Sequence, residues 1–153
     1  RKVEWATIFF FIGLFVAVGG LSETGVIRDL ATKAVALTEG DVTKTSLLVL
    51  WLSALVSSVL DNIPFVATMI PLIQNMGAMG VDNLEPVWWS LSLGACLGGN
   101  GTLVGASANL IVAGMAADRG VKISFLNYFK ISFPIMIMTI AISTIYVYLR
   151  YLL

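Results

Sequence analysis

The chain has 153 residues, of which 58% are hydrophobic and 12% charged, and its nine basic residues balance nine acidic ones. A soluble domain carries about 25% charged residues, so this composition predicts an integral membrane protein. The zero net charge gives no basis for nucleic-acid binding. The absence of histidine removes the usual proton shuttle and the commonest metal ligand, and the single cysteine, Cys96, excludes an internal disulfide.

The first apolar segment runs without a charge from Trp5 to Ser22. It predicts a membrane-spanning helix over 5–22, with Trp5 at an interface.

The next segment, 24–38, has apolar residues near helical spacing, and Arg28, Asp29 and Lys33 fall mainly elsewhere on the helical wheel. This pattern predicts an amphipathic helix along the membrane surface, which Gly40 ends. A plain surface helix is the alternative.

Two short apolar runs flank Asp61-Asn62-Ile63-Pro64 within residues 45–79. The first run is roughly 22 Å long as a helix, which is short of the ~30 Å hydrocarbon core. Pro64 suits the first turn of a new helix, and Asn62 is placed to cap that helix. We therefore expect a re-entrant helical hairpin with its tip at 61–64. A single spanning helix kinked at Pro64 is the alternative.

Asp61 is the only charge within the long apolar segments. A charged carboxylate at the bilayer centre costs at least ~2.5 kcal/mol, so an intramembrane ionisable group is a functional candidate. The alternative is a structural role, in helix capping or in pairing with a basic residue elsewhere.

The uncharged run 86–117 is too long for one simple span, and five glycines lie between Gly94 and Gly105 together with Asn100 and Thr102. A glycine inside a helix costs about 1 kcal/mol relative to alanine. The run therefore predicts a helix broken at membrane depth, where irregular backbone lines a site or is buried in protein. Close helix packing through small residues four apart is the alternative, and the spacing does not fit a phosphate-binding loop.

The last apolar segment predicts a spanning helix over 125–152, with tyrosines at its far end. The fold class is thus an all-α membrane protein, a single transmembrane domain over 1–153. It would have three membrane-crossing helices (one broken), one re-entrant hairpin and one interfacial helix. A small excess of Lys and Arg predicts that the N-terminus is cytoplasmic and the C-terminus outside, in the plasma (inner) membrane.

Two stretches, Ser53–Pro71 and Gly94–Asn109, closely resemble the ion transporter superfamily. The similarity is nearest to its P-protein and arsenite-permease-like group, with citrate-transporter-like and sodium/dicarboxylate carriers more distant. The resemblance implies two inverted repeats, each with a re-entrant hairpin and a broken helix, in a dimer that works by alternating access. This chain corresponds to the final helices of the second repeat, so we expect it to need the remaining repeat or a second chain.

On this basis we expect a secondary transporter of a small inorganic or organic ion, driven by a sodium or proton gradient. Side-chain and carbonyl oxygens at helix ends suit a sodium ion. The metal ligands would be Asn62 and Asn100, with carbonyls around Leu60, Gly98 and Gly99. Thr102, Ser107 and Asn109 would face the ion or substrate. Asp61 would compensate the charge of the cation or carry a proton, and Pro64, Gly99 and Gly101 would shape the backbone.

Neither an enzyme nor a cofactor is expected, apart from a bound sodium ion. An intramembrane aspartyl protease would need two aspartates that share a proton, and only Asp61 sits in an apolar segment. The rival from another class is a non-transporting membrane subunit or channel piece. The expected partners are the transported ion, membrane lipid and a second copy in a homodimer. No Lys or Arg occurs between Lys44 and Arg119, which weakens a di- or tricarboxylate substrate.

Overall fold

The computed structural model describes residues 5–153, and for residues 6, 7, 10 and 11 it describes the backbone only. This part of the chain is all-helical, as the sequence predicts. Its elements are α1 (Trp5–Glu23), α2 (Val26–Thr38), α3 (Val42–Ser57), α4 (Asn62–Ala78), α5 (Glu85–Gly98), α6 (Ser107–Ala117), α7 (Phe125–Val147) and the π-helical turn η1 (Tyr148–Leu152).

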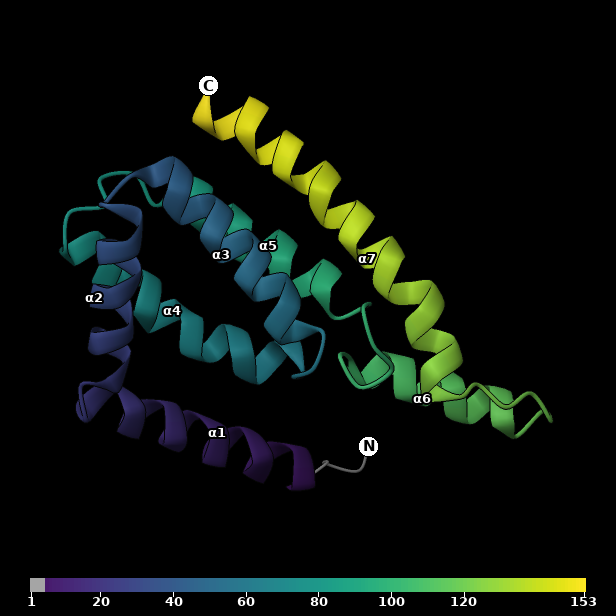
Figure 1. Ribbon diagram of the computed structural model, residues 1–153. Helices are drawn as coiled ribbons and strands as arrows, with labels where there is room; N and C mark the ends of the chain where they lie inside the picture. Colours follow the sequence, from purple (N-terminus) through teal and green to yellow (C-terminus); the bar gives the residue numbers. More distant parts are fainter. Residues whose placement is uncertain (1–4) are drawn as a thin grey trace.

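Helices α3 and α5 form the centre of the fold, and no other pair packs as extensively. They run side by side in the same direction, and α4 turns back from the end of α3 (Figure 1). Helix α2 packs against α4, and α1 packs against both α2 and α4. Helix α7 packs against α5. The larger buried apolar cluster joins α2, α3, α4 and α5, and the smaller one joins α3 to α7. Among the described helices, α6 packs against none of the others.

By length and composition, one helix among the described residues could cross a membrane, Phe125–Leu152. This agrees with the crossing predicted over 125–152. The crossings predicted over 5–22 and 86–117, and the re-entrant depth of 45–79, stay predictions. The predicted orientation depends partly on Arg1 and Lys2, which lie outside the described residues.

Small residues let α3 and α5 approach until their backbones touch. A Cβ added at Gly98 would lie 2.6 Å from the Cα of Ala54, and one added at Gly94 would lie 2.8 Å from the Cβ of Ser53. The packing alternative for Gly94 and Gly98 is therefore correct, and it holds together with the helix break, because α5 ends at Gly98 and α6 begins only at Ser107. Three serine hydroxyls on these two helices are buried without a hydrogen-bond partner in the described part of the chain: Ser46, Ser53 and Ser90.

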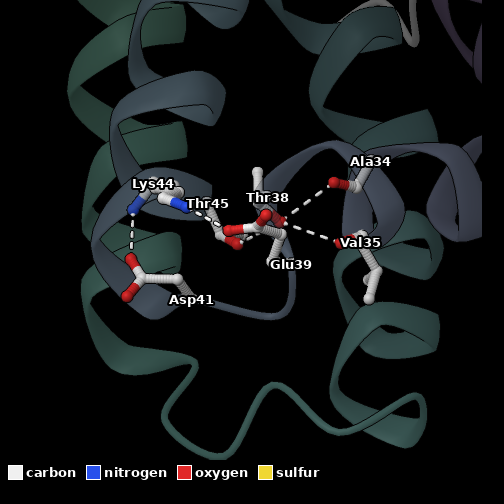
Figure 2. Close-up of polar contacts among 7 residues, drawn as sticks. All are labelled: Ala34, Val35, Thr38, Glu39, Asp41, Lys44 and Thr45. Carbon is white, nitrogen blue, oxygen red and sulfur yellow. Dashed lines mark hydrogen bonds and ion pairs between the residues drawn. The ribbon is translucent and has the colours of Figure 1, made fainter.

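A polar corner joins α2 to α3 outside the apolar segments (Figure 2). Helix α2 ends where Glu39 and Gly40 both adopt left-handed backbone angles. The carboxylate of Asp41 then caps α3 by accepting the Lys44 backbone N–H at 2.7 Å. The Lys44 ammonium donates to Glu39 in an exposed ion pair, and this hydrogen bond and opposite charge lower the pKa of Glu39.

The close approach of α3 and α5 predicts a large effect of one added methyl group. We expect Gly98→Ala to lower the free energy of unfolding in detergent by about 1–3 kcal/mol, the usual cost of overpacking. Gly114→Ala is the matched control, because a Cβ there meets nothing within 4 Å. The control is expected to be neutral or to stabilise α6 by about 0.5–1 kcal/mol. Equal effects of the two substitutions would contradict the packing.

The Glu39–Lys44 ion pair at this corner predicts a small pH dependence of the free energy of unfolding. Because the pKa of Glu39 is lowered from its ordinary value of 4.5, the ion pair stabilises the fold above that pH. This contribution is lost as the pH falls through the lowered pKa. Glu39→Gln should therefore flatten the acid limb of a stability–pH curve while leaving its slope between pH 6 and 8 unchanged. An unaltered acid limb would show that the pair does not form in solution.

Candidate functional site

The turn between α3 and α4 lies directly against the loop 99–106 that separates α5 from α6. Thr102 is 4% exposed, and its hydroxyl donates to the backbone carbonyl of Ser58. The same hydroxyl oxygen accepts the Gly105 N–H at 3.1 Å. A Cβ at Gly105 would lie 2.7 Å from the Ser58 carbonyl oxygen. The hairpin tip and the helix break predicted separately from the sequence thus form one polar region.

Ser57 ties the end of α3 to the last turn of α5. Its buried hydroxyl donates to the Ala95 carbonyl at 2.7 Å. That carbonyl also accepts the Gly99 N–H, the last helical hydrogen bond before the break. The sequence analysis assigned no role to Ser57 or Ser58. The pairs that they form span 38 and 44 residues, so no local spacing points to them.

Asp61 caps two helices at once. One carboxylate oxygen accepts the Ile63 N–H at 3.2 Å, which makes Asp61 the N-cap of α4. The other accepts both the hydroxyl of Ser107 at 2.5 Å and its backbone N–H at 3.3 Å, at the first residue of α6. The prediction that Asn62 caps α4 is therefore wrong, since Asn62 is the first helical residue. The carboxylate is the stronger acceptor for a helix N-terminus.

Asn109 holds the loop 99–106 from the first turn of α6. Its side-chain amide donates to the carbonyls of Gly99 at 2.9 Å and Thr102 at 3.0 Å. Gly98 accepts the Gly101 N–H at 2.8 Å, so two of the predicted ion-binding carbonyls, those of Gly98 and Gly99, each already accept one hydrogen bond. A carbonyl has a second lone pair, so a further ligand remains compatible with this geometry.

The side chains of Asn62 and Asn100 differ from the other predicted site residues. Asn62 is half-buried and Asn100 exposed, and neither side chain forms a hydrogen bond within the described part of the chain. Asn62 is the first residue of α4, and Asn100 lies two residues after the end of α5, so both are at the polar region. Among the described residues no cluster of three or more acidic, cysteine or histidine side chains exists, so a metal ion here would depend on neutral oxygens and Asp61.

Four helix ends meet in this region. Helices α3 and α5 end here, at Ser57 and Gly98, and helices α4 and α6 begin here, at Asn62 and Ser107. Each C-terminal end carries about half a negative charge and each N-terminal end about half a positive one. These partial charges of opposite sign nearly cancel. The Asp61 carboxylate is the only fully charged group in this polar region. It borders a cavity of about 300 Å³ whose other walls come from α1 and α4, including Leu14, Val18, Pro64 and Thr68.

The geometry gives Thr102 a structural role that one substitution can test. Thr102→Val keeps the shape of the side chain but leaves the Ser58 carbonyl and the Gly105 N–H without this partner. We expect a loss of about 1–3 kcal/mol in the free energy of unfolding, the range for a buried polar group left unpaired. Thr102→Ser keeps the hydroxyl and should lose less. If valine is tolerated as well as serine, the hydroxyl does not hold the loop.

The chain is similar to known membrane transporters. The family described as "Citrate transporter" matches residues 1–94. An uncharacterized transporter of Mycobacterium tuberculosis is 45% identical over 152 residues, which is 98% of this chain and 35% of that protein. The 46 kDa membrane protein of Mycobacterium leprae is 43% identical over 99% of this chain and 36% of its own length.

A mammalian protein is also similar to nearly the whole of this chain. The P protein of Homo sapiens is 40% identical over 153 residues, which cover 95% of this chain and 18% of that protein. The chain thus spans about a third, or less, of the length of the curated relatives it matches. No solved structure matches the chain significantly.

Proposed function

The chain belongs to the citrate transporter family, and we propose that it supplies the ion-binding region of a secondary active transporter. In this proposal a sodium or proton gradient drives a small ion across the membrane by alternating access. The family and the transporter names of its relatives support membrane transport and speak against an enzyme. The coupling ion, the substrate and the transport cycle are our proposal.

The observation that carries the proposal is the convergence of the hairpin tip and the helix break. The sequence places both interruptions in apolar segments, and the structure joins them through the Thr102–Ser58 and Asp61–Ser107 hydrogen bonds. Discontinuous helices whose ends meet in this way are the usual means by which transporters bind ions. Packing alone would need the tight contact of α3 and α5, but not two polar breaks that face each other.

Asn62 and Asn100 are the proposed sodium ligands, because their side chains have no other partner in the described chain. The carbonyls of Leu60, Gly98 and Gly99 would complete the coordination, and Asp61 would balance the charge. Ser107 faces this carboxylate, whereas Thr102 and Asn109 already hold the loop and would act on the ion through the backbone that they fix. Pro64 and Gly101 would set the shape of the two interruptions.

The proposed substrate is a small ion with few charges. No Lys or Arg lies between Lys44 and Arg119, so the described site offers only helix N-termini to an anion. A tricarboxylate such as citrate would need cationic groups from another part of the assembly. The chain would lie in the plasma membrane as part of a homodimer, with its N-terminus in the cytoplasm and its C-terminus outside. The small excess of Lys and Arg on the N-terminal side supports this orientation.

A second candidate is a membrane subunit or channel piece that does not transport without a partner chain. One observation favours it: α6 packs against no other helix in the described part of the chain.

Thermal melting of the purified protein in sodium, potassium or choline chloride of equal ionic strength tests the sodium site. We expect a sodium-specific rise in Tm, because a ligand at 100 times its Kd adds ~2.7 kcal/mol to stability. Asn62→Ala and Asn100→Ala should each abolish the rise. Asn127→Ala, on an exposed asparagine at the start of α7, is the matched control and should keep it.

Other outcomes separate the candidates. A pH response that Asp61→Asn removes, without a response to sodium, would indicate proton coupling. No response to either cation, together with inert liposomes, would favour the non-transporting subunit. A sodium response that survives both asparagine substitutions would place the site elsewhere.

A further inference from the structure

The link between Asp61 and Ser107 joins two elements that have little other contact. Helix α6 contains no buried residue and packs against no other described helix. Its N-cap residue, Ala106, provides no side-chain cap. The first turn of α6 is therefore fixed by the Asp61 carboxylate and by the hold of Asn109 on the loop.

The two oxygens of Asp61 are used unequally. One bonds within its own helix start, to the Ile63 N–H. The other accepts two donors from Ser107, which is exposed and belongs to a separate helix. A cation that reaches Asp61 would therefore meet the Ser107 donors at the second oxygen.

We propose that Ser107 and the coupling cation compete for Asp61, so that cation binding detaches the first turn of α6 from the hairpin tip. This inference rests on the proposed function. A bound cation repels the positively polarised hydroxyl and amide hydrogens of Ser107. It also repels the positive end of the α6 dipole. Attachment of α6 and occupation by a cation are thus alternative states of one carboxylate.

No other charged group takes part in this exchange. None of the described charged side chains forms a hydrogen bond or an ion pair with Asp61. Helices α4 and α6 contain no titratable residue. On the neighbouring elements, Glu23 ends α1, Lys44 and Glu85 lie in the first turns of α3 and α5, and Asp118 follows α6. The competition therefore depends on Asp61 alone.

The consequence is that Ser107 lowers the apparent cation affinity. Ser107→Ala removes the stronger donor and keeps the backbone N–H, so the cation meets less competition. We expect the sodium concentration at the midpoint of the Tm rise to fall about tenfold, which corresponds to ~1.4 kcal/mol.

The experiment titrates the purified protein with sodium chloride against choline chloride while Tm is recorded. Ser107→Thr keeps a hydroxyl and should leave the midpoint near that of the unaltered protein. Ser92→Ala, on an exposed serine of α5 away from the site, is the matched control and should also leave it unchanged. Asp61→Asn should remove the response to sodium.

Hydrogen exchange of the unaltered protein tests the same idea if Ser107→Ala does not fold. Saturating cation should speed exchange of amides in the first turn of α6 and leave the core of α3 and α5 unchanged. Slower exchange in the first turn of α6 would overturn the inference. So would a sodium response whose midpoint is the same in Ser107→Ala, and in that case the proposed function would stand. No sodium response of the unaltered protein would refute both the inference and the proposed sodium site.

Discussion

The contact on which the rest of the structure depends is the backbone-to-backbone approach of α3 and α5. Small residues on both helices, Gly94 and Gly98 against Ser53 and Ala54, allow it. Because the two helices run parallel and end at the same level, their C-termini meet (Figure 1). The chain must then restart twice from that level, as α4 and as α6. The close contact therefore decides where the polar region lies, and the hydrogen bonds of Ser57, Thr102 and Asp61 fix its details.

The partial backbone charges of the polar region nearly cancel, so its single carboxylate, Asp61, dominates the electrostatics there. Two helix C-termini and two helix N-termini contribute partial charges of opposite sign. In an apolar environment, a charge without a partner is expensive, so Asp61 needs either hydrogen-bond donors or a cation. The structure shows the first condition, in which Ile63 and Ser107 supply the donors. This is also the structural role that the sequence allowed as the alternative to function. The two roles are compatible, because the same oxygen can serve both in turn.

Sequence reasoning predicts the interruptions well and the contacts between them poorly. Pro64 and the glycines after Gly94 disfavour a continuous helix locally, so the ends of α3 and α5 follow from residue type. The prediction chose Asn62 over Asp61 as the cap and was wrong, since both residue types are good caps and the partner Ser107 lies 46 residues away. The bonds of the Ser57 hydroxyl and the Ser58 carbonyl also join distant residues, 38 and 44 apart. The meaning of Gly98 was ambiguous for another reason: a glycine that ends a helix and one that permits close packing look the same, and here one residue does both.

The contact of Gly98 with α3 also sets a limit on genetic suppression. A methyl group added at Gly94 would meet the Cβ of Ser53 as well as backbone, so glycine at position 53, which lacks that Cβ, relieves part of the clash. For a methyl group added at Gly98, the three nearest atoms are all backbone atoms of Ala54. No side chain there is left to shorten, and only a wider separation of the two helices restores the fit. Revertants of a Gly98 substitution should therefore map to positions that set the distance between α3 and α5, far from the altered residue, or restore glycine itself.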